Sequence, residues 1–215
     1  RALADAGRTA DAEAMLVDLW RTRGLTEEGF AALFAAYPAL LAPHHAARAD
    51  RMLWRRRTED AARLLPVLDE DRRARARARI GYIDGADDLA DRLAAVPDPL
   101  RTDPALAYDR FNRLAARGDW TEAVALLRNR SARGAAALVH PWRWASWRRT
   151  LARWQMRAGK SRVAYDLASR HFLDDGASFA DLEWLSGNLA LTDLADPALA
   201  QRHFETYAAA VSTPI

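Results

Sequence analysis

The sequence predicts an all-α protein, for three reasons. Its 10 glycines and 9 prolines fall between periodic apolar segments rather than inside them. No Asn-Gly or Asp-Gly turn joins alternating runs of β-branched residues, so no β-hairpin is indicated. Half of the 215 residues are hydrophobic and 28% are charged, a composition that suits a folded chain.

Local signals place the helices of the first half of the chain. Thr9 precedes a run of apolar residues at helical spacing over residues 10–20. Pro43 ends one helical segment, and the next is expected over His44–Arg57. Thr58 is followed by two acidic residues, which suit the positive end of the helix dipole, and it begins a helix whose apolar positions extend to residue 68.

The stretch from residue 73 to residue 80 reads RARARARI and alternates with period two. Alanine and arginine are strong helix formers and poor strand residues, so a helix is predicted here. Its arginines ring the helix rather than forming one face: Arg72, Arg73, Arg75, Arg77 and Arg79. They are interpreted either as a solvated surface with carboxylate partners nearby or as a wall that faces an anionic polymer.

Aspartate–proline pairs mark two helix starts in the second half. Asp103 is an expected N-cap before proline, and Asp196 repeats this arrangement before a last helix that runs to about Val211. Three further helices are predicted between these starts: one begun by Asp119 or Thr121 and running to Asn129, one from Pro141 to Gly159, and one over Phe179–Leu191 with Ser178 as its cap.

A recurring fragment indicates how these helices pair. Each copy is an alanine followed three residues later by two largely bulky side chains, and the copies begin at Ala12, Ala61, Ala123, Ala164 and Ala200. Small residues let one helix approach its neighbour closely. Because the spacing between copies is uneven, we predict an irregular α-solenoid of antiparallel helix pairs, about twelve helices in all, shaped as a ring or an arc. Residues 1–215 are expected to form a single superhelical segment of a longer parent.

Composition excludes several classes of site. The chain has no cysteine, which removes disulfides, thiolate metal sites and cysteine nucleophiles. Its longest apolar stretch, Ala31–Pro43, is too short to cross a bilayer, so no transmembrane segment is expected. The formal net charge is +3, and Lys160 is the one lysine among the 32 lysines and arginines. No signature of a nucleic-acid-binding module accompanies this charge, so no nucleic-acid partner is expected.

Tryptophans and arginines gather on the segment expected to begin at Pro141. One stripe at helical spacing comprises Trp144, Trp147, Leu151, Trp154 and Ala158. The stripe predicts a core seam, and the alternative is an aromatic platform for sugar rings. A basic cluster on the same segment comprises Arg143, Arg148, Arg149 and Arg153. Trp142 lies off the stripe, and with Arg149 and Arg153 it makes up the candidate substrate-binding set.

The histidines and carboxylates indicate no catalytic or metal site. The five histidines include no His-Glu-x-x-His motif and no pair four residues apart on a helix, so no metal is expected. His171 and His203 are assigned to apolar helical faces, which predicts hydrogen-bonded core residues, and His140 is an expected helix cap. Glu183 lies beside apolar neighbours, which would suit an acid of raised pKa, but a pair with a nearby arginine is the favoured interpretation.

Several stretches of the sequence resemble one protein family. Residues 44–54 read HHAARADRMLW, and residues 103–110 read DPALAYDR. The most specific stretches are Ala164–Phe172, Phe179–Gly187 and His203–Ile215. Together they resemble the superhelical region of the soluble lytic murein transglycosylases, and the likeness covers the chain from about residue 44.

The resemblance implies a function in cell wall turnover. Members of this family work in the periplasm of Gram-negative bacteria, after removal of a signal peptide that is not found in this chain. They cut the bond between N-acetylmuramic acid and N-acetylglucosamine in peptidoglycan and leave a 1,6-anhydro sugar end. One glutamate of a lysozyme-like domain acts as acid and then as base, and no metal or other cofactor is needed.

The family's catalytic motifs are not found in this sequence. It holds no Glu-Ser pair, no Gly-Leu-Met-Gln-like segment and no Asn-Ala-Gly, so no position is assigned a catalytic role. The resemblance therefore implies the non-catalytic superhelical scaffold of a lytic transglycosylase. Its expected partners are peptidoglycan and the absent catalytic domain. The alternative is a free-standing helical-repeat module that binds proteins through its surface.

Overall fold

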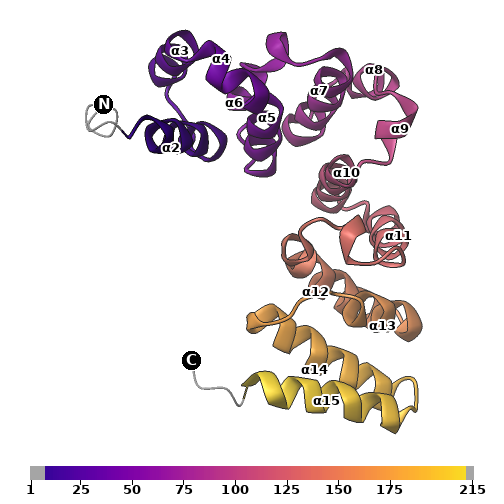
Figure 1. Ribbon diagram of the computed structural model, residues 1–215. Coiled ribbons are helices and arrows are strands. Elements are labelled where there is room, and N and C mark those ends of the chain that lie inside the picture. The colour runs from indigo at the N-terminus through magenta and orange to yellow at the C-terminus, as the bar shows by residue number, and fades with distance from the viewer. Residues whose placement is uncertain (1–7, 212–215) are drawn as a thin grey trace. The chain divides into compact units, whose positions relative to one another are not determined.

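A computed structural model describes residues 8–211, and the prediction of an all-α fold is confirmed: this part of the chain contains helices and no strand (Figure 1). The elements follow the chain in this order: α2 (Thr9–Thr22), α3 (Glu27–Ala36), α4 (Pro38–Leu41), η1 (Ala42–His44), α5 (His45–Trp54), α6 (Thr58–Ala62), η2 (Leu65–Val67), α7 (Glu70–Asp84), α8 (Leu89–Ala94), α9 (Asp98–Arg101), α10 (Pro104–Arg117), α11 (Trp120–Ser131), η3 (Ala135–Ala137), α12 (Pro141–Arg157), α13 (Ser161–Ser169), α14 (Gly176–Thr192) and α15 (Pro197–Val211).

The chain divides into two compact units. The N-terminal unit ends at Asp109 and the C-terminal unit begins at Arg110, so the boundary falls inside α10. In the N-terminal unit, α5 contacts α2, α6 and α7. Trp20, Met52 and Leu64 are fully buried in the apolar core between these helices.

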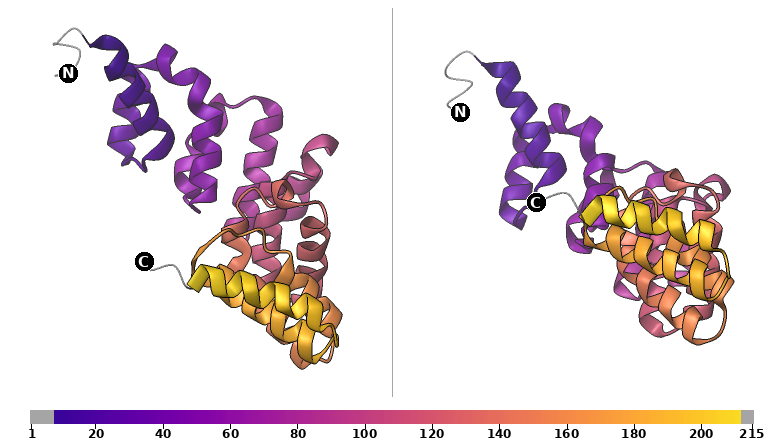
Figure 2. Two further views of the ribbon diagram at one scale, coloured as in Figure 1. Left: turned by 60° about the horizontal axis from the view of Figure 1, so that its bottom comes forward. Right: turned by 90° about the horizontal axis from the view of Figure 1, so that it is seen from below.

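In the C-terminal unit, each of the last helices packs on the next one. Helix α13 contacts both α12 and α14, and α14 contacts α15 along its length. Both views of Figure 2 show α14 and α15 side by side. The alanines of the recurring fragment explain this close packing, because Ala123, Ala164 and Ala200 are buried, as is Ala61 in the other unit.

The aspartate–proline helix starts are confirmed. The side chain of Asp103 accepts a hydrogen bond from the backbone N–H of Leu106 at 2.9 Å. The side chain of Asp196 accepts one from the backbone N–H of Leu199, also at 2.9 Å. Each bond satisfies one of the donors that a helix leaves free in its first turn.

Three predicted helix boundaries are wrong. The helix that begins at Thr58 ends at Ala62, and a short 3₁₀ turn follows it. Pro66 explains this, since a proline ring clashes with the carbonyl four residues before it. Helix α5 ends at Trp54, three residues before the predicted end. Ser178 does not cap α14, which begins at Gly176 with Asp175 in the N-cap position.

A glycine allows the close approach of α14 and α15. A Cβ atom placed on Gly187 would lie 2.6 Å from Cε1 of Phe204, well inside van der Waals contact. We expect Gly187→Ala to lower the free energy of unfolding by about 1–3 kcal/mol, because the collision outweighs the helix propensity that alanine adds. Denaturant unfolding measures this change. In the background of Phe204→Leu the penalty should shrink, and an equal penalty in both backgrounds would contradict the proposed contact.

Candidate functional site

The exposed side of α12 carries aromatic and basic residues. This helix contains five arginines and no acidic residue. Near its start the side chain of Trp142 is 61% exposed, although tryptophan is usually well covered. The guanidinium carbon of Arg143 lies 4.5 Å from the centroid of the Trp142 ring. This cation–π contact holds the ring while leaving much of it open to solvent.

Two arginines of α12 share one carboxylate of α14. Arg149 Nη1 donates to Asp181 Oδ2 at 3.1 Å, and Arg153 Nη2 donates to Asp181 Oδ1 at 2.6 Å. All three side chains are about one-third exposed. The cluster therefore has two positive charges and one negative charge, with further guanidinium N–H donors beyond those that Asp181 occupies.

A second exposed tryptophan belongs to the same surface. Trp184 is 45% exposed and follows Asp181 by three residues on α14, a spacing that puts both residues on one face of the helix. We name the set Trp142, Arg149, Arg153, Asp181 and Trp184 the α12–α14 surface. Along α12, the step from Trp142 to Arg153 covers about 16 Å at the rise of an α-helix.

The structure brings two of the three predicted site residues together. Arg149 and Arg153 meet at Asp181, and Trp142 lies on the exposed side of the same helix. Sequence reasoning missed Asp181 and Trp184. The spacing of these two residues and the negative charge of Asp181 were visible in the sequence, but nothing local indicated that α14 would lie against α12.

The buried side of α12 differs from the predicted seam. Trp144 and Leu151 are fully buried as expected, whereas Trp147 and Trp154 are half-buried and Ala158 is exposed. The buried face instead includes Arg148.

Arg148 was assigned to the basic cluster, but it is completely buried. Its guanidinium donates to the backbone oxygen of Leu167 and to Ser131 Oγ, each at 2.7 Å. Leu167 lies in the last turn of α13, where carbonyls lack helical partners, so Arg148 closes the end of a neighbouring helix.

Other arginines also close helix ends. Arg48 is fully buried and donates to the backbone oxygens of Trp20 and Arg23 at the end of α2. Arg101 donates to the backbone oxygens of Ala94 and Val96 at the end of α8. The planar guanidinium can reach two acceptors at once, which a lysine ammonium does less well. Part of the arginine content therefore has a structural explanation.

The arginines of α7 have the carboxylate partners that one interpretation expected. Arg75 pairs with Asp50 and Asp103, and Arg79 pairs with Asp50 and Asp109. The expectation of a solvated helix is wrong for Arg79, which is completely buried.

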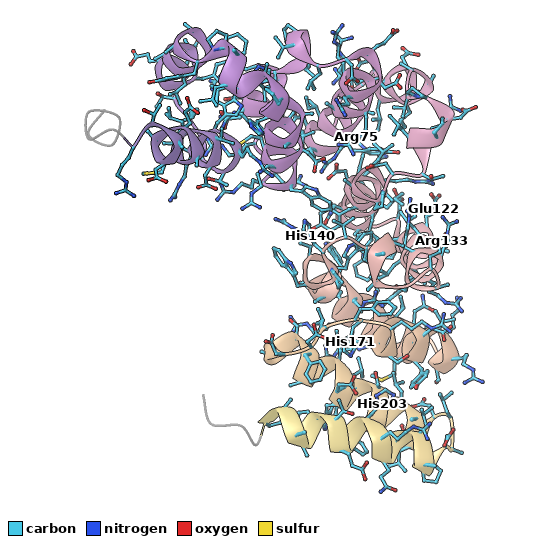
Figure 3. The ribbon with its side chains drawn as sticks, in the orientation of Figure 1. Arg75, Glu122, Arg133, His140, His171 and His203 are labelled. Carbon is cyan, nitrogen blue, oxygen red and sulfur yellow. The ribbon has the colours of Figure 1, made fainter. Side chains whose placement is uncertain are left out.

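Glu183 is paired, but with histidines instead of an arginine. It lies 7% exposed on α14. His171 Nε2 is 2.7 Å from Glu183 Oε1, and His203 Nδ1 is 2.6 Å from Glu183 Oε2. The Tyr165 hydroxyl is 2.9 Å from His203 Nε2, and the backbone N–H of Leu173 donates to His171 Nδ1 at 3.0 Å. In Figure 3, His203 lies on the side of α15 that faces α14.

These hydrogen bonds contradict the alternative interpretation of Glu183 as an acid of raised pKa. Burial alone would raise the pKa of the carboxyl, but hydrogen bonds from His171 and His203 outweigh burial and lower the pKa to about 2. Glu183 is therefore a carboxylate near neutral pH. Both histidines are hydrogen-bonded as predicted, although His171 follows α13 and is not on a helix. His140 occupies the N-cap position of α12 without a capping bond from its side chain.

Within residues 8–211, no group of three or more histidine, aspartate or glutamate side chains is arranged to hold a metal ion. No helix there is long and apolar enough to cross a membrane. Comparisons of the chain with protein-family models, with curated proteins and with solved structures gave no match.

Proposed function

We propose that this chain is the non-catalytic superhelical scaffold of a periplasmic lytic murein transglycosylase and that it binds peptidoglycan. The parent enzyme would cleave the glycan between N-acetylmuramic acid and N-acetylglucosamine with formation of a 1,6-anhydro end. The scaffold would hold or position the glycan for a catalytic domain. The proposal starts from the resemblance of residues 44–215 to that family.

The observation that carries the proposal is the α12–α14 surface. Exposed tryptophan rings offer flat apolar faces to the C–H groups of sugar rings, and Trp142 is held in place by Arg143. Arg149 and Arg153, about two and three turns further along α12, suit the carboxylates of peptidoglycan stem peptides. A tryptophan that belonged to the apolar core would be covered by its neighbours, whereas Trp142 is largely exposed.

The packing of successive helices supports a solenoid. In the C-terminal unit the order α12, α13, α14, α15 along the chain is also the order of contacts. Helices stacked in this way present a continuous surface to a long polymer. Closure into an arc or a ring is part of the proposal, and small-angle scattering of the purified chain would measure it.

Binding to insoluble peptidoglycan tests the proposal directly. We expect Trp142→Ala to weaken cosedimentation of the chain with purified peptidoglycan about tenfold, since a lost aromatic contact of about 1.4 kcal/mol corresponds to that factor. Leu191→Ala is the matched control, because Leu191 is an exposed apolar residue of the same unit outside the α12–α14 surface. Equal binding of both variants and the unmodified chain would contradict a role for this surface.

The chain alone should release no muropeptides from peptidoglycan. Among the described residues, the buried carboxylate Glu183 is fully engaged by His171 and His203. Detection of 1,6-anhydro products by mass spectrometry after incubation with the purified chain would show that the proposed non-catalytic role is wrong.

A protein-binding module is the second candidate function. A shallow, open depression lies along α15 and is lined mainly by apolar residues, among them Leu191, Pro197 and Phe204. Depressions of this kind accept an apolar helix face. This function would be favoured if the chain failed to bind peptidoglycan and if Leu191→Asp abolished capture of a defined protein partner.

A further inference from the structure

Buried polar atoms without hydrogen-bond partners gather in the core of the N-terminal unit. Arg48 is completely buried, and its Nη1 atom donates to the backbone oxygens of Trp20 and Arg23. Its Nε and Nη2 atoms have no partner among residues 8–211, and the same holds for Nε1 of Trp20 and Nδ1 of His45. Buried polar atoms are nearly always paired, so four such atoms in one core indicate an acceptor that the chain itself does not supply.

Ring contacts place these four atoms in one cluster. The guanidinium carbon of Arg48 lies 4.5 Å from the centroid of the Trp20 ring, and the ring centroids of Trp20 and His45 are 5.5 Å apart. His45 and Arg48 lie one turn apart on α5 and therefore share a face of that helix. The imidazole of His45 also stacks on Phe34, which holds its plane. Polar atoms from α2 and α5 are thus close enough to share one small ligand.

The charges next to this cluster are not balanced. Asp60 is the carboxylate that acts on Arg48, but its two oxygens already accept from Arg57 and Arg63. The three arginines therefore face one negative charge. Burial lowers the pKa of Arg48, Asp60 raises it, and Arg57 and Arg63 lower it further. An arginine stays protonated in a folded protein, so a bound anion would offset the surplus of positive charge.

Burial limits the kind of ligand that these atoms can bind. Trp20 and Arg48 are both 0% exposed, so their donors are out of reach of a polymer or of another protein. The unpartnered atoms of Trp20 and Arg48 are all N–H donors, which bind anions and not cations. Burial lowers the pKa of His45 from 6.5, so its imidazole is neutral at about pH 7.5 and can carry its proton on Nδ1. A small monovalent anion fits these limits, because burying a second charge would cost far more.

We propose that the N-terminal unit binds one halide ion of the size of chloride between α2 and α5. Arg48 donates to the ion from Nε and Nη2, Trp20 donates from Nε1 and His45 donates from Nδ1. The ion neutralises Arg48 inside the core and joins the end of α2 to α5. None of these residues belongs to the α12–α14 surface, so the halide site does not depend on the proposed function.

The chloride concentration should therefore affect the thermal stability of the chain. We expect the melting temperature to rise by about 2–6 °C between about 5 mM and about 300 mM sodium chloride at about pH 7.5, since a ligand that binds only the folded state stabilises it by mass action. Sodium gluconate at equal ionic strength is the control, because gluconate screens surface charges equally but is too large for an enclosed site. The same melting temperatures in both salts would overturn the proposal.

Variants of the donors make this experiment specific. His45→Phe keeps an aromatic ring against Phe34 and removes one donor, so the chloride-dependent rise should fall to less than about half. His44→Phe is the matched control, since it removes the preceding imidazole, which is not one of the unpartnered groups, and it should keep the full rise. Arg48→Lys keeps the charge without the fork of N–H donors and should abolish the rise. If Arg48→Lys does not fold, the comparison of the two histidine variants decides, and an equal rise in both would overturn the site.

Anomalous diffraction from crystals grown in sodium bromide would locate the ion directly. We expect a difference peak within hydrogen-bonding reach of Arg48 Nη2, because bromide replaces chloride in such a site. The guanidinium also lies over the rings of Trp20 and Phe30, whose faces attract its positive charge. A water molecule at this position, or ring faces that cover all the donors, with no anomalous signal in either case, would overturn the proposal.

Discussion

Replacing Arg79 with methionine is expected to lower the free energy of unfolding of the N-terminal unit by about 3–5 kcal/mol. Arg79 is completely buried on α7, and its guanidinium donates to Asp109 at 2.6 Å and to Asp50 at 2.8 Å. Asp109 is itself only 3% exposed. Removing the arginine leaves a buried carboxylate without its closest counter-charge, which is among the most destabilising changes a single substitution can make.

The effect of Arg79→Met should depend on pH. Burial raises the pKa of Asp109 to about 6, although Arg79 opposes the rise, so the variant should have a higher pKa still. A raised carboxyl pKa means that the folded state holds more protons than the unfolded state, and stability falls as the pH rises through that pKa. The loss caused by the substitution should therefore be larger at pH 8 than at pH 5.

Two further variants make the Arg79 experiment specific. Arg77→Met changes an exposed arginine of the same helix and should alter stability by less than about 0.5 kcal/mol. Adding Asp109→Asn to Arg79→Met should restore part of the lost stability, because the unpaired charge is gone. Urea unfolding at both pH values, followed by hydrogen exchange in α7 and α10, measures these changes. A double variant less stable than Arg79→Met would contradict the ion pair as the cause.

Replacing Glu183 with leucine is expected to destabilise the C-terminal unit by about 2–4 kcal/mol. The carboxylate joins three parts of that unit, since His171 follows α13, Glu183 lies on α14 and His203 lies on α15. Leucine would leave the buried imidazole of His171 and the half-buried imidazole of His203 without their acceptor. Hydrogen exchange of the α14 and α15 amides should accelerate accordingly.

Glutamine at position 183 should cost far less, about 1 kcal/mol. The hydrogen bond from Leu173 N–H to His171 Nδ1 assigns the ring proton of His171 to Nε2, so the amide oxygen of glutamine can accept from it. His203 can change tautomer, accept from the amide nitrogen at Nδ1 and donate to the oxygen of Tyr165 from Nε2. A loss as large as that of the leucine variant would contradict this arrangement.

Acid should distinguish the two variants from the unmodified chain. The pKa of Glu183 is lowered from 4.5 to about 2 on folding, so its contribution to stability is present above pH 4.5 and is lost as the pH falls toward 2. Glu183→Gln should lack this dependence, and an unchanged acid profile in the glutamine variant would show that other carboxyl groups cause it.

Helix starts and helix class were predictable because their signals act within a few residues. Asp103 and Asp196 cap their helices through the backbone N–H three residues later. The alternating stretch that includes Arg73 is helical, as the intrinsic helix propensities of alanine and arginine predict. The helix that begins at Thr58 is shorter than predicted, because the ring of Pro66 would clash with the carbonyl four residues before it if the helix continued.

The candidate site was only half predictable for a similar reason. The spacing of Trp142, Arg149 and Arg153 on one helix is local, and it correctly put them outside the buried stripe. Their partner Asp181 comes 28 or more residues later in the chain. Its role depends on which helix packs beside α12.

The sequence by itself determined that this protein is helical, where two of its helices begin with capped turns, and that alanines would allow close helix contacts. The tertiary structure alone decided which charged residues are buried. In the sequence, Arg148 and Arg79 cannot be told apart from exposed arginines, yet both are buried. One meets the end of α13 and the other meets Asp50 and Asp109, up to 30 residues away. The physical reason is that burying a charge requires acceptors at hydrogen-bonding distance, and only the packing of helices brings them there.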